Sequence, residues 1–111
     1  MESRKSEIII SGGENINPFE VEKEMLQHSA IKETAVFPLK SNEWGETVAA
    51  VIILEEDVNN FKVEELNTYL RDKLAGFKIP KKIFIVKELP KTESGKVEKK
   101  KLTEKYSATN F

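Results

Sequence analysis

The stretch Val48–Leu54 reads Val-Ala-Ala-Val-Ile-Ile-Leu, and it is expected to decide the fold because it is continuously apolar. Its valines and isoleucines are β-branched, and β-branched residues favour strands. An apolar run without alternating polar residues indicates a central strand that is covered on both faces, or on one face by helices. We therefore predict a central strand over residues 47–54.

The segments on either side of this run predict its neighbours. Thr34–Leu39 and Lys82–Val86 are predicted to complete a three-stranded sheet, and Ile8–Ile10 is predicted to be a short strand near the N-terminus. Helices are expected over residues 18–28, where Asn17 can cap the first turn, and over residues 63–75 and 97–106. The fold class is α+β: a small N-terminal strand and turn, then a three-stranded sheet with helices packed on it.

Length and composition indicate one small domain that is not stabilised by disulfides or by a structural metal. The chain has 111 residues, and it contains no cysteine that could form a disulfide or a thiolate metal site. No metal site is expected. No apolar run approaches the ~18 residues that span a bilayer, and the first residues are polar rather than signal-like. We expect a cytoplasmic protein with no membrane span.

The net charge of −1 hides a strong asymmetry along the chain. Residues 78–111 contain 10 lysines and 4 acidic residues, a balance of +6. Residues 1–77 contain 8 basic and 15 acidic residues, a balance of −7. A basic end suits an anionic partner such as a nucleotide, although a solvated helix face explains the same pattern equally well.

Two loops carry the residues most suited to chemistry. Pro90–Lys96 (PKTESGK) holds turn-forming residues and presents Lys96 at its end, where an ammonium group can approach a phosphate or a carboxylate. Gly12–Gly13 interrupts the N-terminal strand, and paired glycines permit positive φ and the close approach of a ligand. Each loop taken alone is more often an ordinary solvated turn.

Four stretches, read together, resemble the C-terminal domain of adenylate-forming enzymes. This superfamily includes acyl-CoA synthetases and the adenylation domains of peptide synthetases. The stretches are Ile8–Glu22, Asn42–Glu46, Ala75–Pro80 and Pro90–Lys96, and their order and spacing match those of the family. The resemblance covers nearly the whole chain, from Arg4 to about Leu102.

The resemblance also implies where the domain begins and ends. Residues 1–7 correspond to a hinge or linker from a missing large N-terminal domain. Residues 8–106 correspond to a C-terminal lid domain, and residues 107–111 to a tail. Ser6 stands at the hinge position, which is usually Asp or Lys in the family.

The family assigns roles to matching residues in this chain. Lys96 matches the catalytic lysine of adenylate formation, while Lys91 and Gly95 match positions that support the loop or bind phosphate. The residues that match the binding path of coenzyme A or pantetheine are Gly12, Gly13, Trp44, Phe77 and Lys78.

Each member of this binding path also has a purely structural interpretation. Gly12–Gly13 can be a tight turn, Trp44 a lid on the core, and Phe77 a ring packed on the preceding helix. Ile79 stands where the family can have arginine, so a phosphate contact at that segment is in question.

The implied function is that of the lid domain of an ATP-dependent acyl-CoA synthetase. ATP and coenzyme A are the implied substrates. Mg²⁺ accompanies ATP and is bound mainly by the N-terminal AMP-binding domain, which is the implied partner. The isolated lid is expected to be inactive. The alternatives are the lid of an adenylation domain that loads carrier-bound phosphopantetheine, and a free-standing interaction module without catalysis. Nucleic-acid binding is disfavoured, because the lysines alternate with acids and no recognition motif is present.

Overall fold

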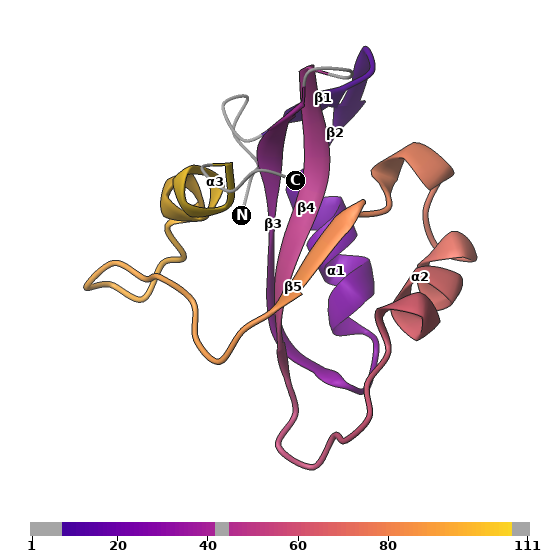
Figure 1. Cartoon of the computed structure of the whole chain (residues 1–111), viewed down its shortest axis with the longest axis vertical. Helices are drawn as coiled ribbons and strands as arrows, with labels where there is room; N and C mark the ends of the chain where they lie inside the picture. Colours follow the sequence, from indigo (N-terminus) through magenta and orange to yellow (C-terminus); the bar gives the residue numbers. More distant parts are fainter. Residues whose placement is uncertain (1–7, 42–44, 108–111) are drawn as a thin grey trace.

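The sheet is built around β4 (Gly45–Leu54), which contains the apolar run. In the computed structural model, which describes residues 8–41 and 45–107, β3 (Ile31–Ser41) lies antiparallel along one side of β4. On its other side β4 pairs with β1 (Ile9–Ser11) and with β5 (Lys82–Ile85), which runs parallel to it (Figure 1). Residues Val48–Ile52 are fully buried, so the prediction of a central strand covered on both faces is confirmed.

The N-terminal strand and turn form a complete hairpin. β2 (Glu14–Ile16) folds back antiparallel on β1 and brings Ile16 opposite Ile9. The sequence did not predict β2, because this segment has a single apolar side chain and resembles a loop before the helix. The hairpin extends the three-stranded sheet of β3, β4 and β5, and the α+β class is confirmed.

Two apolar cores lie on opposite faces of the sheet, because alternate residues of a strand point to opposite faces. α1 (Pro18–Leu26) and α2 (Val63–Arg71) contribute to the first core, and α3 (Lys99–Ser107) contributes to the second (Figure 1). The first core contains Ile9, Ile16, Val21, Met25, Ile31, Val36, Val48, Ala50, Ile52, Leu66, Leu70 and Leu74. The second contains Ala35, Phe37, Leu39, Ala49, Val51, Leu89 and Leu102.

The helices are in the predicted places, but their ends differ. Asn17 caps α1 as expected, since its side-chain oxygen accepts a hydrogen bond from the Phe19 N–H at 2.9 Å. α2 ends at Arg71 rather than near residue 75, and the chain then turns so that Leu74 enters the first core. Among the residues that the structure describes, no helix has the length and hydropathy needed to cross a bilayer.

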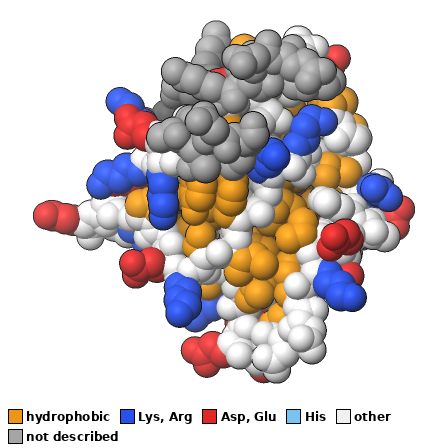
Figure 2. Space-filling view, in the orientation of Figure 1, with side chains coloured by type: hydrophobic (Ala, Val, Ile, Leu, Met, Phe, Trp, Pro, Cys, Tyr) orange, Lys and Arg blue, Asp and Glu red, His pale blue; other side chains and the backbone are white. Residues whose placement is uncertain are grey.

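α3 docks on the second face through Leu102 and through the Tyr106 ring. The Tyr106 ring stacks on Phe84 with 4.1 Å between ring centroids and lies 5.8 Å from the Phe37 ring. α3 covers only part of this face. Figure 2 shows hydrophobic side chains gathered along the middle of the molecule in this view, over β4 and β5, and Ile85 of β5 leaves 51% of its surface exposed.

The outer edge of β3 is occupied near its middle by side chains from two helices. The Val36 N–H donates to the Glu22 carboxylate of α1 at 2.7 Å. The Pro38 carbonyl accepts from the Thr103 hydroxyl of α3 at 2.9 Å, and Pro38 itself has no N–H to offer. Such features prevent an edge strand from pairing with another chain.

Candidate functional site

Lys96 lies near the tip of a tight hairpin that projects from the molecule between β5 and α3 (Figure 1). Lys91 and Val97 pair across the hairpin as an antiparallel bridge. The Thr92 N–H donates to the Lys96 carbonyl at 2.8 Å, and the Gly95 N–H donates to the Thr92 carbonyl at 2.9 Å. With Gly95 at φ +87°, this is the pattern of a β-turn followed by a left-handed residue.

The Lys96 side chain is exposed to solvent. Its backbone N–H donates to the Thr92 hydroxyl at 3.2 Å, so the hairpin fixes the backbone from which the side chain extends. Within residues 8–41 and 45–107, no carboxylate forms an ion pair with its ammonium group. The side chain is therefore available to an external anion, as the catalytic role predicted for it requires.

Gly95 is needed because of its backbone conformation, and not because a side chain at this position would clash. At φ +87° an L-residue is strained, but a Cβ at this position meets nothing within 4 Å. Gly95→Ala should therefore lower the free energy of unfolding by about 1–2 kcal/mol and Tm by about 4–8 °C. Thermal unfolding measures both. Gly76→Ala is the control, since Gly76 has equal space and no positive φ; an equal loss there would contradict the explanation.

Three lysines of the basic end pair with acids of the first third of the chain. The Lys78 ammonium lies 2.9 Å from the Glu20 carboxylate, that of Lys91 lies 2.9 Å from Glu33, and that of Lys99 lies 2.6 Å from Glu22. Part of the charge asymmetry is thus neutralised within the domain. Sequence reasoning missed these acids, although the opposite charges of the two parts of the chain were the available signal.

Another acid within the basic end pairs locally. Glu98, which follows the hairpin, lies 2.7 Å from the Lys101 ammonium one helical turn away. Its hydrogen bond and its charge raise the pKa of Lys101 above the ordinary value. The pair therefore neutralises part of the positive charge near the start of α3 within the basic end itself.

Gly12 and Gly13 form the two-residue loop of the β1–β2 hairpin. Their φ angles are 58° and 85°, and positive φ at both central residues is the requirement of a type I′ turn. A Cβ on Gly13 meets nothing within 4 Å, so the space beside this glycine is open. The Ile10 N–H donates to the Glu46 carboxylate at 2.9 Å, which ties the hairpin to the start of β4.

Phe77 and Lys78 lie in a 3₁₀ turn, η2 (Gly76–Lys78). Only Ile79, before Pro80, is extended, because proline restricts the residue that precedes it. Phe77 leaves 39% of its surface exposed, and the Lys78 ammonium lies 5.8 Å from its ring centroid. The aromatic ring and the cation are therefore adjacent on the surface.

The structure does not gather the predicted residues into one site. Three different places around the sheet hold the predicted residues (Figure 1). They are the glycine hairpin formed by β1 and β2, the turn η2, and the Lys96 hairpin. Trp44 and Ser6 fall outside the described residues. No group of three or more His, Asp or Glu side chains within the described residues is placed to hold a metal ion.

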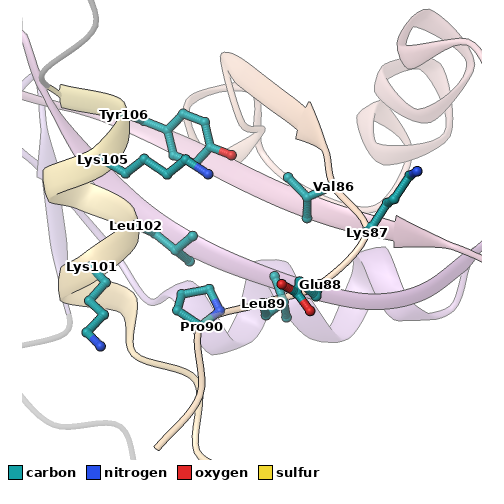
Figure 3. A pocket seen from close by; sticks show the side chains of 9 residues that line it. All are labelled: Val86, Lys87, Glu88, Leu89, Pro90, Lys101, Leu102, Lys105 and Tyr106. Carbon is teal, nitrogen blue, oxygen red and sulfur yellow. The ribbon is translucent and has the colours of Figure 1, made fainter.

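A pocket of about 560 Å³ lies at the base of the Lys96 hairpin, between segment 86–90 and α3 (Figure 3). Figure 3 shows the Leu102 side chain pointing from α3 toward this space, with Pro90 across from it. Its lining residues are Val86, Lys87, Glu88, Leu89, Pro90, Lys101, Leu102, Lys105 and Tyr106. The hairpin base is thus incompletely packed against the helix.

Comparison with known families decides what kind of domain carries these features. The family described as the AMP-binding enzyme C-terminal domain matches residues 20–96, which is more than half of the chain. The chain belongs to this family. Lys96 is the last residue of the matched region, while the glycine hairpin precedes it.

Individual relatives of this AMP-binding enzyme C-terminal domain are CoA ligases. The chain is 45% identical over 104 residues to 2-succinylbenzoate–CoA ligase of Listeria monocytogenes, covering 94% of this chain and 22% of the ligase. It is 35% identical over 109 residues to a long-chain-fatty-acid–CoA ligase of Mycobacterium tuberculosis, covering 98% of this chain and 21% of that enzyme. The domain thus spans about a fifth of these relatives.

Solved structures agree with the family assignment. The domain matches a Mycobacterium tuberculosis fatty acyl CoA synthetase with a TM-score of 0.88 and 35% identity, covering 95% of this chain and 20% of that one. It matches Bacillus subtilis o-succinylbenzoate CoA synthetase, solved with its acyl-adenylate intermediate, with a TM-score of 0.82 and 39% identity, covering 89% and 20% of the two chains.

Proposed function

We propose that this chain is the lid domain of an ATP-dependent acyl-CoA synthetase and that it works against a large N-terminal AMP-binding domain. Residues 1–7 act as the linker to that domain, residues 8–106 form the lid, and residues 107–111 are a tail. The observation that carries the proposal is an exposed Lys96, held on an ordered hairpin without a carboxylate partner among the described residues. Family membership and the CoA-ligase relatives support it.

In the first half-reaction, a carboxylate oxygen attacks the α-phosphorus of ATP, and pyrophosphate leaves. Negative charge gathers on the attacking carboxylate and on the α-phosphate oxygens. The Lys96 ammonium, delivered by lid closure, interacts with both groups and stabilises the transition state. ATP enters with Mg²⁺, and we assign the binding of both mainly to the N-terminal domain.

In the second half-reaction, the thiol of coenzyme A attacks the acyl carbonyl, and AMP leaves. We assign the Gly12–Gly13 loop to the path of the pantetheine arm, since the space beside Gly13 is open and neither glycine has a side chain to obstruct it. Phe77 and Lys78 offer an exposed ring and a cation to the nucleotide end of coenzyme A, and Trp44 is assigned to the same path. The use of ATP and coenzyme A favours a cytoplasmic location.

A chimera tests the proposal without assuming what precedes this chain. The matching C-terminal region of the Listeria ligase is replaced by this chain, and pyrophosphate release and thioester formation are measured with 2-succinylbenzoate. Both rates should exceed those of the truncated ligase by at least about 100-fold. Free coenzyme A should be preferred to carrier-bound phosphopantetheine as the thiol. A folded chimera no more active than the truncated ligase would contradict the proposal and favour a non-catalytic interaction module.

A further inference from the structure

Apolar burial anchors the Lys96 hairpin only at its base. Leu89 enters the second core before the hairpin, and Val97 packs against that core at the end of the stem, but Lys91, Gly95 and Lys96 are all exposed. The pocket of about 560 Å³ lies between α3 and segment 86–90, which leads into the hairpin (Figure 3). Internal hydrogen bonds fix the shape of the hairpin, but they do not fix its direction relative to the sheet.

One ion pair fixes the incoming arm of the hairpin. The Lys91 ammonium lies 2.9 Å from a carboxylate oxygen of Glu33 on β3. Lys91 is the residue that bridges to Val97, so this contact attaches the paired stem directly to the sheet. Both side chains are partly exposed, at 40% and 38%, so the contact is weak in energy but specific in geometry.

A second, better-buried ion pair fixes the outgoing arm. The Lys99 ammonium, at the start of α3, lies 2.6 Å from Glu22 of α1, with side-chain exposures of 18% and 14%. The same Glu22 oxygen accepts from the Val36 N–H of β3 at 2.7 Å. Lys99 also lies 4.4 Å from the centroid of the Phe19 ring. Two side chains of α1 therefore hold the residue that lies three positions after Lys96, and β3 holds one of the two in place.

We propose that Glu33 and Glu22 are positioning residues for Lys96. They clamp the two arms of its hairpin to the β3–α1 unit, so the ammonium group enters the neighbouring active site in one direction. The inference rests on the proposed function. Neither glutamate touches the reacting atoms, and each acts through a lysine close to Lys96 in the chain. A displacement of about 1 Å at a reacting centre can cost about 100-fold in rate, so even a weak clamp has a measurable effect.

The first test follows the two half-reactions in the chimera. Glu33→Gln should lower kcat for adenylate formation about 3- to 5-fold, leave KM for ATP unchanged, and spare thioester formation from preformed adenylate. Glu22→Gln should have a larger effect of about 10-fold, because its pair is better buried. The exchanged pair Glu33→Lys with Lys91→Glu should recover most of the loss. Glu65→Gln, an exposed carboxylate of α2, is the control and should change neither half-reaction.

A double-mutant cycle separates positioning from general stability. In a Lys96→Ala background, Glu33→Gln should have no further effect on adenylate formation, because the group that it positions is gone. An effect that persists in that background overturns the inference, and so does an equal loss in both half-reactions or no loss at all. These results would leave the proposed function standing, since that depends on the activity of the unmutated chimera.

Amide hydrogen exchange tests the clamp without any catalytic readout. In the 111-residue chain, Glu33→Gln should speed exchange of the hairpin amides of Thr92 and Glu98 about 3- to 5-fold and leave the Ala50 amide of β4 unchanged. Unchanged exchange at Thr92 and Glu98 overturns the inference even if the chimera is inactive.

Discussion

Lys96→Ala in the chimera should lower the rate of adenylate formation about 100- to 1000-fold, because it removes one preorganised charge from the transition state. The side chain is exposed and has no carboxylate partner within the described residues, so its loss leaves no unpaired charge behind. Pyrophosphate release measures this half-reaction. Thioester formation from preformed 2-succinylbenzoyl adenylate should remain within about threefold of the unmutated chimera, a difference under 1 kcal/mol.

The control is chosen to match charge and exposure. Lys100→Ala removes an exposed lysine of α3 that is four residues further along the chain, and it should change neither half-reaction. Thermal unfolding should be nearly the same for both variants, since surface substitutions of this kind cost little. Equal losses in adenylate and thioester formation for Lys96→Ala would show that the assigned role is wrong.

Gly13→Val should have the opposite selectivity, with thioester formation reduced about 10- to 100-fold and adenylate formation nearly unchanged. Two effects contribute. Valine at φ +85° strains the hairpin by about 1–2 kcal/mol, and its side chain projects into the space assigned to the pantetheine arm. Single-turnover thioester formation with preformed adenylate is the measurement.

Two further variants separate strain from obstruction. Gly13→Asn tolerates positive φ better than valine, so it should preserve stability while still reducing thioester formation. Asn60→Val places the same β-branched residue at φ 60° in a different loop, so it should lower stability without affecting either half-reaction. If Gly13→Asn has full activity, the glycine serves the turn alone.

The hydrophobic pattern predicted most of the fold. The apolar run identified β4, the flanking segments identified β3 and β5, and periodicity located the three helices. The hydrophobic pattern gave the wrong local structure where tertiary contacts determine that structure. Residues 72–75 continue the helical periodicity of α2, yet the chain turns there so that Leu74 reaches the first core. β2 forms because the glycine loop aligns it with β1, and its own composition gives no strand signal.

The candidate site was predictable only in part. Turn-forming residues predicted that Lys96 would lie on an exposed loop, and the structure places it there. The contacts that fix the loop could not be predicted, because Lys91 and Glu33 are 58 residues apart and their pairing depends on how β3 lies beside the hairpin. The catalytic and binding roles remain predictions, since they require a second domain.

The occupied edge of β3 limits how this domain can meet a partner. The longest strand of the sheet has the Val36 N–H and the Pro38 carbonyl engaged near its middle by side chains of the domain itself. Association by shared backbone ladders is therefore blocked along that part of the edge. Along that part of the edge, contacts with a partner are left to side chains, and such contacts can be broken and remade without opening the sheet.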